Sequence, residues 1–187
     1  MLNLNFIIFP ELFTERLVLR ELNADDAQQV HLLRSNEEVN QFIDRIPSSG
    51  IEDALAHINK IDEYVKNKQS VNWAIALKGN PELIGGICFW NFDEANSTIE
   101  LGYELLPEYH HKGIMTEAIH AAIQFGFEQI KAETITAFPS ANNIKSVGIL
   151  EKIGFKLDDG LYANTHDGID DMLTYILKPD MLVSKGK

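Results

Sequence analysis

The chain has 187 residues, which fits one α/β domain with a core large enough to need no disulfide. Its formal net charge of -12 disfavours nucleic acid and anionic membranes as partners and favours cationic ones, although acidity can also serve solubility alone. No apolar run is long enough to span a bilayer, and the lone Cys88 cannot form an internal disulfide, so we expect a cytoplasmic protein.

The first third of the chain predicts one strand and two helices. Apolar and polar residues alternate around residues 17–20, which indicates a strand, and Asn23 can cap a helix that begins near Ala24. Apolar residues then recur at helical spacing over residues 51–65, after Ser48 or Ser49 as a cap. A strand followed by two helices is therefore expected here.

The rest of the chain predicts a meander and then alternating helices and strands. Short turn-rich segments separate three expected strands at 71–77, 83–91 and 98–106, so these strands should pair in antiparallel fashion. A helix at 115–129, a strand at 134–138, a helix at 143–153 and a strand at 172–177 follow. We expect one domain over 1–187, with a core from about 12 to 178 and a flexible tail over 179–187.

The most informative segment is the loop that joins the third meander strand to the next helix. It contains Lys112 and Gly113 directly before the helix. The first amides of a helix have no partner within it and lie at the positive end of its dipole, which suits a pyrophosphate. An ordinary helix cap explains the same segment, so by itself this motif does not decide between the two.

Three separated motifs together resemble a known family. The segment TERLVLR at 14–20, the segment from Gly102-Tyr103 through PEYHHKGIMTEA at 102–118, and NIKS with LEKIGF at 143–155 look like motifs of the GNAT superfamily of acyl-CoA-dependent N-acetyltransferases. More narrowly, they resemble its Rim-type branch, which includes ribosomal-protein N-terminal acetyltransferases. The resemblance spans residues 12–178.

The resemblance implies a fold and a cosubstrate. The fold is α/β (α+β), with a mixed, mostly antiparallel sheet of about seven strands flanked by helices. Its fourth and fifth strands, here 98–106 and 134–138, splay apart to receive the pantetheine arm of acetyl-CoA, and no metal is required. The implied cofactor-binding residues are Leu105, Leu106, His110, His111, Lys112, Gly113, Ile114, Met115, Thr116, Asn143 and Ser146.

Two residues of the cofactor loop depart from the family pattern. His110 occupies the position of a Gln or Arg, and Met115 stands where a Gly or Ala is usual. We therefore expect either that the Met115 side chain points away from the pyrophosphate or that the loop is shifted slightly. His110 and His111 are expected on the phosphate side, with a catalytic base and exposed polar residues as the alternatives.

Candidate catalytic residues lie on the third meander strand and on the last helix. Glu100 and Glu104 share a strand face, and either could deprotonate an amine, whereas strand carboxylates can also be simply solvated. The resemblance places Ser146 near the thioester sulfur, while Leu150 replaces the Tyr that serves as the acid in many relatives. Helix capping by Asn143, with Ser146 solvated, is the alternative.

These observations predict an acetyl-CoA-dependent N-acetyltransferase. The amine acceptor is a protein N-terminal α-amine, as on a basic peptide, or a small amine; a protein acceptor predicts an open acidic groove and a small one a closed pocket. A non-catalytic acyl-CoA sensor or scaffold is the alternative, and the protein is expected as a monomer or homodimer. A covalent intermediate on Cys88 is disfavoured, since a single strand Cys is most often a packing residue.

Overall fold

The computed structural model describes residues 1–158, 160 and 171–182. Within these residues, eight strands form one sheet in the order β1-β2-β3-β4-β5-β6-β8-β7. The strands are β1 (Leu12–Phe13), β2 (Leu17–Glu21), β3 (Val71–Leu77), β4 (Asn80–Asp93), β5 (Thr98–Leu105), β6 (Thr134–Ala137), β7 (Lys156–Leu157) and β8 (Tyr175–Leu177). Neighbouring strands are antiparallel except β5 and β6, which are parallel.

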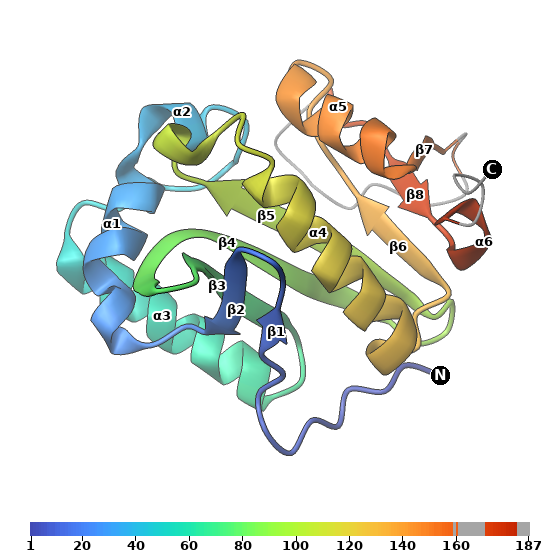
Figure 1. Ribbon diagram of the computed structural model, residues 1–187, viewed down its shortest axis with the longest axis horizontal. Coiled ribbons are helices and arrows are strands. Elements are labelled where there is room, and N and C mark those ends of the chain that lie inside the picture. The colour runs from blue at the N-terminus through green and yellow to red at the C-terminus, as the bar shows by residue number, and fades with distance from the viewer. Residues whose placement is uncertain (159, 161–170, 183–187) are drawn as a thin grey trace.

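Helices cover both faces of this sheet (Figure 1). They are η1 (Ala24–Asp26), α1 (Ala27–Ser35), α2 (Glu37–Asn40), α3 (Ile51–Lys66), η2 (Pro107–Tyr109), α4 (Ile114–Phe125), its π-helical extension η3 (Gly126–Ile130), α5 (Ile144–Ile153) and α6 (Pro179–Leu182). None of the helices in the described ranges has the length and apolar character to cross a membrane. The mixed α/β class and the mostly antiparallel sheet were correctly predicted.

Two hydrophobic clusters, one on each face, hold these layers together. Trp73 and Ile75 point into the larger cluster beneath α4, whereas the intervening Ala74 points into a smaller cluster with α1 and α3. This alternation is the expected period of a strand that is buried on both faces. The meander therefore forms a shared floor for α4 on one side and for α1 and α3 on the other.

The N-terminal segment belongs to the core, although we expected the core to begin near residue 12. Leu2 is buried, and Phe6 and Phe9 pack against the larger cluster. The indole Nε1 of Trp73 donates to the carbonyl of Pro10 at 2.7 Å. Residues 1–10 have no regular secondary structure, so periodicity could not reveal their role.

Several boundaries differ from the sequence prediction. The N-cap of α3 is Gly50, not Ser48 or Ser49; Ser49 instead donates to Asp53 in the first helical turn. The strands β1 and β7 were not predicted, since two residues carry no detectable alternation, so the sheet has eight strands rather than about seven.

A short helix near the C-terminal end of the described residues was also not predicted. Residues 179–182 form the short helix α6, where we expected a flexible tail from residue 179. The remainder of that predicted tail, residues 183–187, lies outside the described residues.

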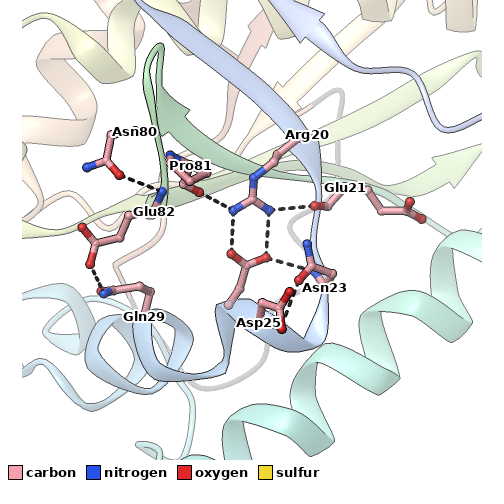
Figure 2. A network of polar contacts seen from close by, with 9 residues as sticks. Arg20, Glu21, Asn23, Asp25, Gln29, Asn80, Pro81 and Glu82 are labelled. Carbon is pink, nitrogen blue, oxygen red and sulfur yellow. Dashed lines mark hydrogen bonds and ion pairs between the residues drawn. The ribbon is translucent and has the colours of Figure 1, made fainter.

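A buried ion pair fixes the entry from the sheet into the helical layer (Figure 2). Arg20 on β2 donates through both terminal nitrogens to Asp26, at 2.6 and 2.8 Å, and Asp26 also accepts from the Asn23 backbone amide at 3.0 Å. Arg20 donates further to the carbonyl of Pro81, at the start of β4. This network joins three segments and positions α1, which carries part of the site described next.

Candidate active site

A cleft opens where β5 and β6 part. The two strands pair only over Thr98–Glu100 and Thr134–Thr136, and β5 continues to Leu105 without β6 beside it. Residues from both strands, from the loop before α4 and from α5 line a cleft of about 1140 Å³. The splay that the resemblance implied at these two strands is thus present.

The backbone of β5 faces this cleft at Leu105. The Leu106 amide donates to the Ile84 carbonyl of β4 at 2.9 Å, so ladder alternation turns the polar backbone atoms of Leu105 away from β4. His110 lies at that side, with Nε2 3.0 Å from the Leu105 carbonyl. Because a carbonyl only accepts, the proton of this bond is on Nε2. His110 thereby braces the end of the strand.

The N-terminus of α4 also opens into the cleft. Gly113 is its N-cap, in the left-handed region at φ 73, and no side chain caps the helix. The Glu117 amide donates to the Gly113 carbonyl, so the preceding amides, from Ile114 to Thr116, have no partner within the helix. The side chain of Met115 is buried in the core, as we expected from its bulk, so this residue can offer a ligand its backbone.

The opening motif at 14–20 holds the cofactor loop in place. Arg16 donates from Nη1 to the Lys112 carbonyl at 2.9 Å and from Nε to Glu117 at 2.6 Å. Thr14 donates to the other oxygen of Glu117 at 2.6 Å. Burial opposes ionisation of Glu117, but the hydrogen bonds from Thr14 and Arg16 prevail and lower its pKa. The motif therefore has a structural role: the residues directly before β2 hold the first turn of α4.

Two predicted cofactor residues do not line the cleft. The ammonium of Lys112 lies over the Tyr109 ring, 5.5 Å from its centre. Leu106 is buried in the smaller cluster. Of the other expected residues, Leu105, the loop members His110, His111 and Gly113, and the helix members Ile114–Thr116 all line it.

Glu100 lies at the point where the two strands separate. The residue is 5% exposed, and its side chain accepts a hydrogen bond from Asn91 Nδ2 at 2.7 Å. Leu101 and Leu105 pack into the larger cluster, so Glu100 and Glu104 point to the opposite face, as predicted. A buried carboxylate on the cleft wall can take a proton from an amine without competition from bulk water.

Glu104 has an ionic partner that sequence reasoning missed. Arg45, from the loop before α3, places Nη1 2.6 Å from Glu104 Oε2. Arg34 and His57 lie close by on α1 and α3 and also line the cleft. The guanidinium of Arg45 therefore reaches from this loop to the sheet.

The N-terminal part of α5 approaches β5 across the cleft. Asn143 caps the helix by accepting from the Ser146 amide at 3.1 Å, as one alternative predicted, but Ser146 is half-buried and not simply solvated. The Ser146 hydroxyl lies 2.7 Å from the Tyr103 hydroxyl. Burial raises the pKa of Tyr103 to about 12, against the opposing effect of Ser146, so the phenol stays protonated at neutral pH. Leu150 is fully buried and packs in the core.

Tyr103 was not predicted as a polar site residue. In the sequence it is only an aromatic residue within an expected strand. Its position one residue before Glu104 only indicated the opposite strand face. The pairing with Ser146 joins residues 43 positions apart, and no local pattern carries that information.

An ion pair bridges α2 and α5 at the cleft. Glu38 accepts from Lys145 Nζ at 2.7 Å and lies 3.6 Å from His110 Nδ1. The hydrogen bond from Lys145 is the main cause that lowers the pKa of Glu38. His111 is exposed at the same end and lines the cleft.

Cys88 lies on the cleft wall beside Gly102. A Cβ atom at Gly102 would come within 3.0 Å of the Cys88 sulfur, so the two strands pack closely here. Burial raises the pKa of the Cys88 thiol to about 12, and Glu104 and Glu100 add to the shift. A protonated thiol is a poor nucleophile, which disfavours an acetyl-cysteine intermediate.

Known proteins share both the sequence pattern and the fold. The acetyltransferase (GNAT) domain family matches residues 16–156. The uncharacterized N-acetyltransferase YoaA of Bacillus subtilis is 31% identical over 149 residues, which cover 80% of this chain and 84% of that protein.

Two solved structures have the same fold at low sequence identity. One is a ribosomal-protein-S5-alanine acetyltransferase from Vibrio fischeri, with a TM-score of 0.76 at 20% identity, covering 91% of this chain and 97% of that chain. The other is a spermidine N-acetyltransferase from Vibrio cholerae in complex with CoA and spermine, with a TM-score of 0.75 at 18% identity, covering 91% and 99%.

The family assignment follows from the sequence match, and the solved structures share the fold. The family match favours catalysis over a purely CoA-binding role. With its parted strands and uncapped helix N-terminus, the chain belongs to the GNAT acetyltransferase family and is an acyltransferase.

Proposed function

We propose that this protein transfers an acetyl group directly from acetyl-CoA to the primary amine of a small molecule. The observation that carries the proposal is the continuity of one cleft from the exposed backbone of β5 to the free amides of α4. A pantetheine arm is flexible and has amide groups, so it can pair with the edge of β5 as an added strand would. Its pyrophosphate then reaches the amides at Ile114–Thr116.

The same path positions the thioester. With the arm along β5, the Leu105 amide donates to the thioester carbonyl, where negative charge develops during attack. The Asn143 side chain uses its oxygen to cap α5, which leaves its amide nitrogen for the arm. The complex of the Vibrio cholerae neighbour with CoA supports CoA as the ligand of this fold.

Each step then has a group in the cleft. Glu100 accepts a proton from the acceptor ammonium, and the neutral amine attacks the carbonyl carbon of the thioester. The tetrahedral intermediate still carries an extra proton on its nitrogen. As it collapses and the C–S bond breaks, the Ser146 hydroxyl, held by Tyr103, gives its proton to the sulfur and takes the proton released by the nitrogen, so Ser146 ends neutral. Glu104 is the weaker candidate for the base, because its Oε2 is engaged with Arg45.

The charges in the cleft favour a small acceptor over a protein N-terminus. A basic peptide requires an open acidic groove, whereas the face around Glu104 also carries Arg34 and Arg45. These cations repel a basic peptide segment. The negative charge of the whole chain does not describe this part of the surface.

The test is thiol release from acetyl-CoA with a panel of small amines, polyamines and peptides. Glu100→Gln should lower kcat/KM by about 10²- to 10⁴-fold, because the base is lost, with little change in the Kd for acetyl-CoA. Glu94→Gln, in the exposed turn before β5, is the matched control and should retain activity. Undiminished turnover in Glu100→Gln would exclude this base, and CoA binding without any turnover would support the sensor alternative. A preference for peptides would instead indicate that the acceptor is a protein N-terminal α-amine.

A further inference from the structure

A cationic corner, formed by Arg34, Arg45 and His57, lies on the cleft wall next to Glu104. Arg45 is fixed there at two of its three nitrogens. Its Nε donates to Asn40 Oδ1 at 2.6 Å, and its Nη1 lies 2.6 Å from Glu104 Oε2. The side chain is 12% exposed, so its planar guanidinium is held rigidly within the wall.

The third nitrogen of Arg45 has no such partner. Nη2 is buried and makes no hydrogen bond among the residues that the structure describes. Glu104 Oε2 is also buried, and its partner is Arg45 Nη1 in the ion pair. An unsatisfied buried donor is costly, so Arg45 Nη2 calls for an anionic ligand group.

The other charges make the corner positive. Burial and the nearby Arg45 lower the pKa of Arg34, with Glu104 opposing them, yet a guanidinium remains charged at any physiological pH. Arg34 Nη1 lies 3.4 Å from His57 Nε2. Burial, followed by Arg34, Arg45 and Lys60, lowers the pKa of His57 to about 4, so its ring is neutral at pH 7. Two cations therefore face one carboxylate.

Among the described residues, the nearby acidic side chains do not neutralise this excess of positive charge. Asp44 lines the rim of the cleft but is exposed to solvent, where its charge is screened. Glu38 is engaged by Lys145. Glu100, deeper in the cleft, accepts from Asn91 and serves the amine in the proposed reaction.

We propose that the acceptor is a zwitterion: a small primary amine that also carries a carboxylate or phosphate group. The anionic group binds Arg45 Nη2 with support from Arg34, and the ammonium group lies against Glu104 and faces Glu100. This inference rests on the proposed function and narrows its substrate class. It replaces the basic acceptor suggested by the net charge, because two desolvated guanidinium groups outweigh distant surface carboxylates.

Matched pairs of amines test this directly on the CoA-bound protein. β-Alanine is compared with its amide, and O-phosphoethanolamine with ethanolamine, with spermidine added as a polycation. Binding is measured by calorimetry, and the His57 ring is followed by NMR during pH titration. The anionic member of a pair should bind at least tenfold more tightly and should raise the pKa of His57, because its charge offsets Arg34 and Arg45. The pair with the larger difference distinguishes carboxylate from phosphate.

Variants separate recognition from folding. Arg45→Gln should abolish the difference within each pair, and Arg45→Lys, which keeps the charge but lacks the planar fork, should retain part of it. Lys60→Gln is the matched control: this exposed cation also acts on His57 but does not line the cleft, so anion preference should persist. Equal binding within the pairs, a preference for spermidine, or full preference in Arg45→Gln would overturn the inference.

Turnover distinguishes this inference from the proposed function. Anion-dependent binding without thiol release from acetyl-CoA would leave the zwitterion site standing and reject the acetyl transfer. Thiol release with equal efficiency for both members of each pair would support acetyl transfer and reject the zwitterion site.

Discussion

Tyr103 and Ser146 form a pair of hydroxyls between β5 and α5, at a distance of 2.7 Å. Tyr103→Phe removes the partner that orients Ser146, while the aromatic ring stays in place. A neutral hydrogen bond contributes about 0.5–1.5 kcal/mol, so kcat should fall by roughly 2- to 10-fold. The KM for acetyl-CoA should change little. Steady-state kinetics of thiol release at saturating acetyl-CoA measures both quantities.

A second tyrosine provides the control for this variant. Tyr175 on β8 donates to Glu151 at 2.9 Å and does not line the cleft, so Tyr175→Phe should leave kcat unchanged. Ser146→Ala combined with Tyr103→Phe should be no worse than Ser146→Ala alone, since Tyr103 acts through Ser146. Additive losses in the double variant would show that Tyr103 acts independently.

At the scale of elements, the contact between β2 and α4 decides how the cofactor loop is held. Arg16→Gln removes the donors to the Lys112 carbonyl and to Glu117. The free amides of α4 would then lose their fixed direction, and we expect the Kd for CoA to rise roughly tenfold. Calorimetric titration with CoA measures the change. The free energy of unfolding should fall by only about 1 kcal/mol, because Arg16 is nearly half exposed.

The exposed pair of Asp62 and Lys66 on α3 is the control for this experiment. It is also a short ion pair, at 2.6 Å, but lies away from the cofactor loop. Lys66→Gln should leave CoA binding as it is. If Arg16→Gln binds CoA with wild-type affinity, the loop keeps its form without the opening motif.

For the whole molecule, His57 makes stability depend on pH. Its pKa is about 4 in the folded protein and about 6.5 when unfolded, so the unfolded state binds the proton first. The stabilisation is complete above pH 6.5 and is lost as the pH falls toward 4. At pH 5 the loss should be about 1–2 kcal/mol, allowing for partial exposure. Denaturant unfolding between pH 5 and 8 measures it.

The corresponding variant isolates this effect from other titrations. His57→Gln cannot titrate, so its free energy of unfolding should vary less between pH 7 and 5 than that of the wild type. The carboxylates with lowered pKa values, such as Glu117 and Asp93, act at lower pH: their stabilisation is present above about pH 4.5 and is lost below it. If the free energy of unfolding changes with pH to the same extent in the wild type and in His57→Gln, the His57 ring is not desolvated in solution.

The amino-acid sequence by itself determined the order of the main elements and the fold class. Alternation along β3 and β5, helical spacing along α3, and the glycine before α4 are local signals, since each arises from residues close together in the chain. The three motifs identified the family. The contributions of residues 1–10 and of the two-residue strands were missed, because short or irregular segments have no period.

Tertiary structure alone decided which polar groups meet in the cleft. Arg16 and Glu117 are 101 residues apart and Tyr103 and Ser146 are 43 apart, and they come together because the sheet and helices pack around one core. The Arg45 guanidinium is oriented by Asn40 and Glu104, from two different parts of the fold. Which charged groups lie together in a cleft depends on this packing and cannot be predicted from the net charge of the chain. An acidic chain can therefore contain the cationic corner in its cleft.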